Sequence, residues 1–199
     1  DLTGITGLNI TLENLKNGSS GKLDLAAALG LDFNPPAPGT NATLQAAAKG
    51  SFTFELTEEL QPKAIKGGAR LDIASAGGAF ADATGIAVVL DSELTPTEIK
   101  QLALRLQKTG VDLAALTVSG PFIVSGSLDA PKQEGKLTVV LTGVDKQALN
   151  LGGAKAGLNF NDTLIGSTNV VELAEGGKLI TINGRMVAAK FSVTRQGLT

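Results

Sequence analysis

The segment from Thr43 to Leu56 alternates apolar and polar residues over almost its whole length. Successive side chains of a β-strand point to opposite faces, so this alternation is typical of a strand with one face buried and one face in water. About 14 residues in a strand span about 46 Å, whereas ordinary strands have about 5–6 residues. The segment therefore predicts a very long amphipathic strand, whose apolar residues are Leu44, Ala46, Ala48, Phe52, Phe54 and Leu56.

The same alternation recurs along the rest of the chain and predicts further strands. They are expected at Leu8–Leu12, Leu23–Phe33, Leu71–Gly77, Phe80–Leu90, Val111–Val118 with a continuation to Val124, Gly135–Val144, Phe160–Leu164, Asn169–Leu173, Leu179–Asn183 and Val187–Val193. Gly and Asn accept positive φ, and Pro has no N–H for a sheet ladder. Turns are therefore expected at Asn17–Gly21, Lys66–Gly68 and Gly176–Gly177, and a loop at Asn34–Gly39. The sequence predicts a mainly β fold, a long curved antiparallel sheet built from hairpins, in a single domain over residues 1–199.

The segment Thr95–Lys108 fits two structures. Its first four residues resemble a capping box with Pro at the first helical position, which predicts a helix. Its leucines at 102, 104 and 106 also alternate with other residues, and Lys108-Thr109-Gly110 supplies a turn. A hairpin is favoured, because strands are expected on both sides. A short helical turn is the expectation for Asp145–Leu149, where Asp145 would be the N-cap.

The composition limits the chemistry that this chain can perform. It has no His, Cys, Trp or Tyr, and its formal net charge is −2. The missing His removes the commonest general base and most zinc sites, and the missing Cys removes disulfides and thiol nucleophiles. The basic stripe that is usual in nucleic-acid binders is not visible either. We therefore expect a protein that is not an enzyme and has no cofactor, metal or nucleic-acid partner.

Three polar motifs are better explained as turns than as sites. Glu58-Glu59 is a close carboxylate pair, but adjacent side chains usually point apart, whereas acid–base work needs facing carboxyl groups. Asn159, Asn161 and Asp162 could offer oxygen ligands to calcium, but no Asp-rich loop supports them, and an Asx turn is favoured. Gly18–Lys22 resembles a phosphate-binding loop without the required spacing or the following helix.

The apolar face of the long strands is the remaining candidate for a functional surface. It is interpreted either as ordinary core or as the lining of a groove for an acyl chain. The length of the strands and the many Ala and Gly residues on the apolar parity favour a groove. The candidate groove residues are Leu44, Ala46, Phe52, Phe54, Leu56, Leu102, Leu104 and Leu106.

Residues Ile99–Phe122 contain an alternating strand, a short Gly turn, a second alternating strand and then Ser119-Gly120-Pro121. This arrangement resembles the AsmA family of bacterial envelope proteins, and Gly135–Leu149 is similar to the segment that commonly follows in that family. The chain is short for the family and lacks its N-terminal membrane helix and its usual terminal repeats. We therefore expect a fragment or the mature part of a longer envelope protein.

The resemblance implies a periplasmic, elongated and curved β-sheet with an apolar concave face. Its role would be outer-membrane biogenesis or the movement of lipid between membranes, and its partners would be lipid or membrane proteins of the envelope. The alternative is a structural or adhesive surface β-domain, a sandwich or a solenoid, that binds through loops such as Asn34–Asn41. The oligomeric state does not follow from the sequence.

Overall fold

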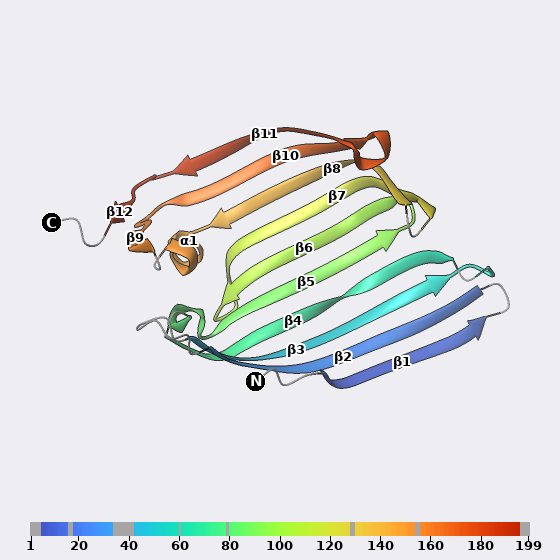
Figure 1. The fold of residues 1–199 in the computed structure, drawn as a ribbon, viewed down its shortest axis with the longest axis horizontal. Coiled ribbons are helices and arrows are strands. Elements are labelled where there is room, and N and C mark those ends of the chain that lie inside the picture. The colour runs from blue at the N-terminus through green and yellow to red at the C-terminus, as the bar shows by residue number, and fades with distance from the viewer. Residues whose placement is uncertain are drawn as a thin grey trace.

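Ten strands form one antiparallel sheet in the computed structural model, which describes residues 5–15, 18–33, 42–59, 61–78, 80–127, 130–153 and 156–195. The strand order is β1-β2-β3-β4-β5-β6-β7-β8-β10-β11, so each strand lies beside its neighbour in sequence (Figure 1). The predicted fold class, a mainly β antiparallel sheet of hairpins, is confirmed. The strands are β1 (Ile5–Leu15), β2 (Gly18–Phe33), β3 (Ala42–Leu56), β4 (Pro62–Gly78), β5 (Ile86–Thr95), β6 (Glu98–Lys108), β7 (Val111–Ser127), β8 (Ala130–Val144), β10 (Leu164–Ala174) and β11 (Leu179–Ala189).

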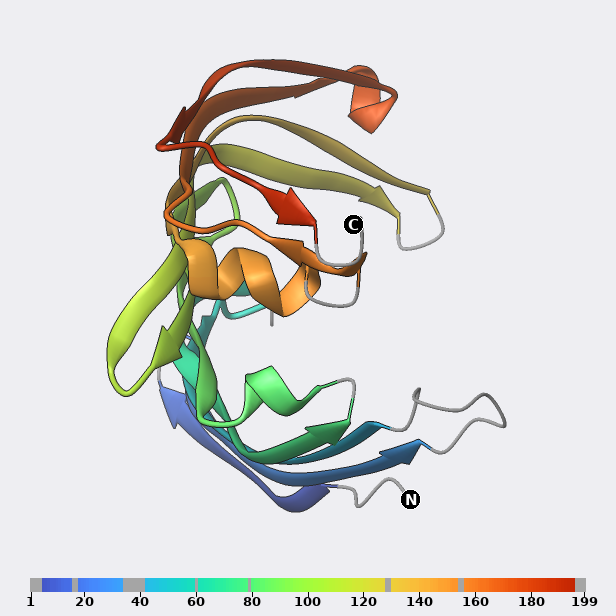
Figure 2. The same ribbon diagram turned by 90° about the vertical axis from the view of Figure 1, so that its left-hand side faces the viewer.

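The sheet curls into an open trough, which Figure 2 shows end on. Several small elements lie inside the curve at one end of the strands. They are the 3₁₀ turn η1 (Ala81–Ala83), the helix α1 (Lys146–Gly153) and a two-stranded sheet of β9 (Leu158–Asn159) and β12 (Thr194–Arg195). A second 3₁₀ turn, η3 (Glu175–Gly177), joins β10 to β11 at the other end (Figure 1).

The long amphipathic strand predicted at Thr43–Leu56 is confirmed as β3, which has 15 residues. The hairpin interpretation of Thr95–Lys108 is also confirmed, because Glu98–Lys108 forms β6 and pairs with β5 and β7. Asp145 is the N-cap of α1: its carboxylate accepts hydrogen bonds from the backbone N–H groups of Gln147 (2.8 Å) and Ala148 (3.0 Å). The loop predicted at Asn34–Gly39 lies outside the described residues.

Five local predictions are wrong. The strand predicted at Val187–Val193 is the end of β11 and stops at Ala189. Lys66–Gly68 is not a turn but the middle of β4, because two glycines there allow a close approach of β3 and β5. Gly18–Gly21, expected in a turn, belongs to β2. The strand predicted at Phe80–Leu90 begins only at Ile86, after η1. Of Phe160–Leu164, only Leu164 lies in a strand, and it opens β10.

The register makes rows of Cα partners that cross the whole sheet and alternate in character. One row crosses all ten strands on the apolar parity: Leu8, Leu25, Gly50, Ala69, Leu90, Leu104, Leu116, Leu141, Ser167 and Met186. The next row is on the other parity and is more polar: Asn9, Asp24, Ser51, Gly68, Asp91, Ala103, Thr117, Val140, Thr168 and Arg185. The sheet therefore has one mainly apolar face and one mainly polar face.

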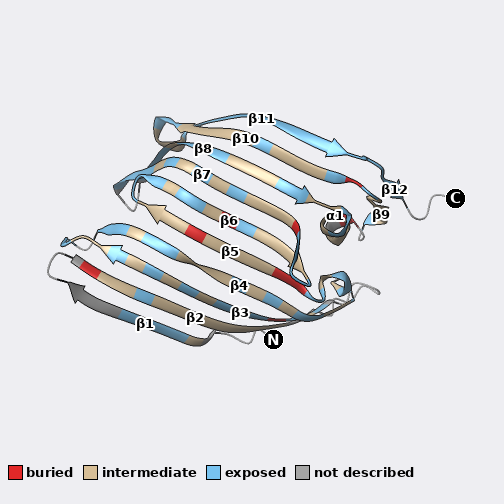
Figure 3. Ribbon diagram, turned by 180° about the vertical axis from the view of Figure 1, so that it is seen from behind, coloured by how far each residue is buried: buried red, intermediate tan, exposed pale blue. Residues whose placement is uncertain are grey.

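The apolar face lines the inside of the trough. Ile86, on the same parity as the apolar residues of β5, borders a hollow that α1 and η1 also line, and these two elements lie inside the curve (Figure 2). Few residues are fully buried in Figure 3, which views the sheet from behind. The buried apolar residues are Ala46, Ile86, Ala87, Ala103 and Leu113.

Candidate functional site

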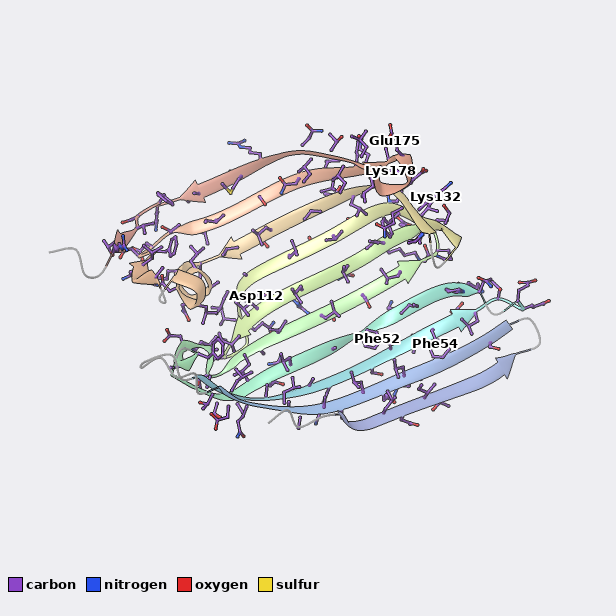
Figure 4. All side chains as sticks on the ribbon, viewed as in Figure 1. Phe52, Phe54, Asp112, Lys132, Glu175 and Lys178 are labelled. Carbon is purple, nitrogen blue, oxygen red and sulfur yellow. The ribbon has the colours of Figure 1, made fainter. Side chains whose placement is uncertain are left out.

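All eight candidate groove residues lie on the apolar parity of the sheet. Five are on β3 and three are on β6, with β4 and β5 between them. One row joins the two groups directly, because Phe52 pairs with Gly67, Gly67 with Ser92, and Ser92 with Leu102. The structure therefore brings residues about 50 positions apart in the sequence onto one continuous surface (Figure 4).

This surface is largely uncovered. Within the described part of the chain, no second sheet packs over the face of β3 to β6. Of the eight candidates, Ala46 is buried, Leu104 is 42% exposed and the other six are half-buried. Since α1, η1, β9 and β12 lie at one end only, the trough stays open along most of its length (Figure 2). Within the described residues, this face of β3 to β6 is therefore an open surface of the curved sheet and not the interior of a two-layer core.

Glycines on neighbouring strands make room for the two phenylalanines of β3. A β-carbon on Gly21 would lie 2.7 Å from Cε2 of Phe54, and one on Gly67 would lie 2.6 Å from Cα of Phe52. Real β-carbons essentially never come this close to another heavy atom. The Phe54 ring therefore covers the backbone of Gly21, and Gly67 allows the backbone of Phe52 to approach closely (Figure 4 labels both phenylalanines).

The groove ends in an apolar hollow of about 510 Å³ between β4, β5, β6 and β7, opposite the end that α1 occupies. This volume lies within the range of small-molecule sites, about 300–1,000 Å³. Gln61 and Lys63 supply polar groups at its margin. The apolar lining is Pro62, Ala64, Ile65, Leu94, Pro96, Ile99, Leu102, Phe122 and Val124.

Sequence reasoning found only Leu102 among the residues of this hollow. No strand was predicted at Ile65, and Phe122 and Val124 were expected only to continue a strand. The pairing Phe54–Ile65–Leu94–Ile99 brings the hollow next to the predicted Phe54. The shared parity of Leu102, Phe122 and Val124 was visible in the sequence, whereas Ile99 reaches the same face only through the bulge between Ile99 and Leu102. The register that places these residues together was not.

The polar face carries ion pairs between neighbouring strands. Glu93 accepts from Lys66 at 3.1 Å and from Lys100 at 3.3 Å, so one carboxylate joins β4, β5 and β6. Hydrogen bonds and charge from Lys66 and then Lys100 lower the pKa of Glu93. Arg105 pairs with Asp91 in the same region. These ion pairs connect neighbouring strands on the outer face, and within the described part of the chain the groove face has no such pairs.

A polar network fixes the elements at the α1 end. The fully buried Thr163 hydroxyl donates to the carbonyl of Ser192 (3.1 Å) and accepts from its N–H (2.9 Å). The Asn159 side chain accepts from the N–H of Asn161 (3.0 Å), so the Asx turn predicted at these residues is confirmed. Asp162 binds Lys146 of α1 instead (3.3 Å). The network holds the segments before and after the β10–β11 hairpin together.

Other candidate chemistry finds no support in the described residues. Glu58 and Glu59 lie exposed in a turn between β3 and β4. The described Asp and Glu residues form no group of three or more that could hold a metal ion. The described helices are too short or too polar to cross a membrane. Comparison with known protein families, with curated proteins and with solved structures gives no match.

Proposed function

We propose that this chain is a non-enzymatic domain that binds the acyl chain of a lipid along its concave face. The observation that carries the proposal is the continuous, uncovered apolar surface from β3 to β7, which ends in the 510 Å³ hollow. Burying apolar surface is favourable by about 25 cal/mol per Å². An acyl chain laid in the groove would bury its own surface together with the exposed or half-buried side chains of the floor.

The proposed biological role is lipid transport or outer-membrane biogenesis in the bacterial envelope, with the periplasm as the compartment. Two features support it. The resemblance of Ile99–Phe122 to AsmA proteins implies this setting, and an open trough lets a chain enter from the side. A hydrated outer face with paired charges suits a domain that shields an apolar ligand from water.

Phe54→Asp tests the proposal, because it places a charge in the groove beside Ile65 and the hollow. Thr53→Asp is the matched control, because the neighbouring residue is exposed and lies on the polar face. We expect binding of a dansyl fatty acid to weaken at least about tenfold in the first variant and by less than about twofold in the second. Thermal melts by circular dichroism establish that both variants fold.

A transfer assay tests the role beyond binding. We expect the wild-type chain to accelerate the movement of a fluorescent phospholipid between vesicles, and Phe54→Asp to lose this acceleration. A folded wild-type protein that binds no fatty acid, or that binds it equally well as Phe54→Asp, would refute the groove function. The structural or adhesive β-domain would then be the better account.

A further inference from the structure

The two outermost strands of the sheet have free edges. Among the described residues, no strand pairs with the outer side of β1 or of β11. Every residue of β11 is exposed, and both strands expose large apolar side chains on the groove parity. The exposed fractions are 58% for Leu8, 62% for Ile10, 58% for Ile180, 65% for Ile182 and 73% for Met186. A long edge of this kind is a ready template for another strand.

The topology determines which strand fits. Neighbouring strands are antiparallel throughout the ten-stranded sheet, so the first and last strands, β1 and β11, run in opposite directions. A second copy in the same orientation can therefore place its β1 beside β11 as an ordinary antiparallel pair. The apolar residues of both edges are even-numbered, and even-to-even pairing keeps them on the same face. Such a junction would continue the groove from one copy into the next.

Charge distinguishes this junction from a symmetric one. Residues 176 to 195 contain Lys178, Arg185, Lys190 and Arg195 and no acidic residue. At the other edge, residues 1 to 17, which include β1, contain two carboxylates and one lysine: Asp1, Glu13 and Lys16. Pairing β11 with a second β11 would bring two basic edges together, whereas pairing β11 with β1 joins basic to acidic.

We propose that copies of this chain associate head to tail, with β11 of one copy adding to β1 of the next. With Met186 opposite Ile10, antiparallel pairing places Ala188 opposite Leu8, so the junction covers Met186, Ile10 and Leu8 and extends the apolar trough across copies. Arg185 is the only charged residue of β11 and Glu13 the only one of β1. When Met186 pairs with Ile10, Arg185 lies one diagonal step from Glu13, within reach of a long side chain. The inference needs no bound lipid and is independent of the proposed function.

A charge swap tests the proposal by sedimentation velocity at an ionic strength of about 10 mM, where charges act over about 30 Å. We expect the wild-type chain to associate as its concentration rises. Arg185→Glu and Glu13→Arg should each weaken association at least about threefold, because each puts like charges at the junction. An equimolar mixture of the two variants should recover wild-type association, because every junction then joins opposite charges.

Lys49→Glu is the matched control for Arg185→Glu, since both variants change the net charge equally. Lys49 is exposed on β3, away from both edges. The control should leave association unchanged. A wild-type chain that stays monomeric at all concentrations overturns the proposal. Weakening by Arg185→Glu alone, with no recovery in the mixture, also overturns it, because that result indicates a symmetric β11 interface.

Cross-linking provides a second measurement, which does not depend on charge. The chain has no Cys, so Ile10→Cys and Met186→Cys each introduce a unique thiol. A disulfide needs Cα atoms about 4.4–6.8 Å apart, which matches directly paired antiparallel residues. On mixing and oxidation we expect the mixed dimer to exceed both homodimers and the dimer that Met186→Cys forms with Thr117→Cys, a mid-sheet control. A yield equal to that control, or a dominant Met186→Cys homodimer, overturns the proposal.

Discussion

The ring of Phe54 on β3 covers the backbone of its Cα partner Gly21 on β2. A β-carbon at Gly21 would lie 2.7 Å from Cε2 of the ring and 2.6 Å from the carbonyl oxygen of Thr11 on β1. The ring could rotate away, but the backbone oxygen could not move without disturbing β1. Gly21 is thus a close-approach position at which three strands meet.

Gly21→Ala should therefore destabilise the protein by about 1–3 kcal/mol, the usual cost of overpacking. Gly7→Ala on β1 is the matched control, since its β-carbon would meet Ala26 Cβ at an ordinary 3.6 Å, and we expect a change within about 0.5 kcal/mol. Urea unfolding followed by circular dichroism measures both. Equal stabilities of the two variants would contradict the close approach.

Affinity for fatty acids should rise with chain length if the groove holds the acyl chain. Each buried CH₂ contributes about 0.8 kcal/mol, which is about fourfold in affinity. We expect this increment from C8 upward until the hollow and groove are filled, as measured by displacement of a dansyl fatty acid. Ile99→Asp should reduce the increment, because Ile99 lines the hollow. An affinity independent of chain length would point to binding through the carboxylate alone.

The Thr163 hydroxyl satisfies both backbone groups of Ser192 and is fully buried. Thr163→Val keeps the shape but removes the hydroxyl partner of the Ser192 N–H and C=O, two part-buried hydrogen bonds that together contribute about 1–3 kcal/mol. We expect faster hydrogen exchange at residues 158–163 and 190–195, with little change in β3 to β6. Thr163→Ser keeps the hydroxyl and should retain most of the protection. Unchanged exchange in Thr163→Val would show that water replaces the hydroxyl.

Low pH should weaken the ion pairs by which Glu93 on β5 connects to Lys66 on β4 and Lys100 on β6. Lys66 and Lys100 lower its pKa from the ordinary value of 4.5. A lowered folded-state pKa contributes stability above the unfolded value, and this stability is lost as pH falls through the lowered pKa. We expect Tm to fall on acidification below about pH 4.5, and less steeply in Glu93→Gln. Because Glu93 is at the surface, the effect on Tm should be small and should shrink in 0.5 M salt.

The cap of α1 gives a prediction for the closed end of the trough. Asp145→Ala removes the acceptor for two N–H groups and should cost about 1 kcal/mol, whereas Asp145→Asn should retain most of the cap. Exchange of the amides at Gln147 and Ala148 is the direct measure. No acceleration in Asp145→Ala would indicate that these amides find another partner.

The sequence was most informative where apolar and polar residues alternate without interruption. Leu44 to Leu56 and Leu102 to Leu106 identify strands β3 and β6 and their inward faces, since alternation follows directly from strand geometry. Gly67 and Gly68 led to a wrong prediction of a turn, because glycine is favoured both in turns and where two strands approach each other closely. Only the contact with Phe52 distinguishes the two, and that contact is non-local.

The sequence could predict which face of the sheet a candidate residue lies on, but not which residues of other strands lie beside it. The parity of Phe122 and Val124 was readable, yet their place beside Ile65 depends on the registers of three strand pairs and on bulges between Ile99 and Leu102 and between Glu93 and Leu94. A one-residue change of register moves every side chain to the other face. Local periodicity carries no information about which bulge occurs in which hairpin.

The strand order has a consequence for how the fold can change length. Because each strand pairs with its sequence neighbours, stability accumulates hairpin by hairpin along one dimension, as in repeat proteins. Inserting or deleting a pair of strands preserves strand direction and the inward parity of every remaining strand. Mutation can therefore lengthen or shorten the trough by whole hairpins without rearranging what is already folded.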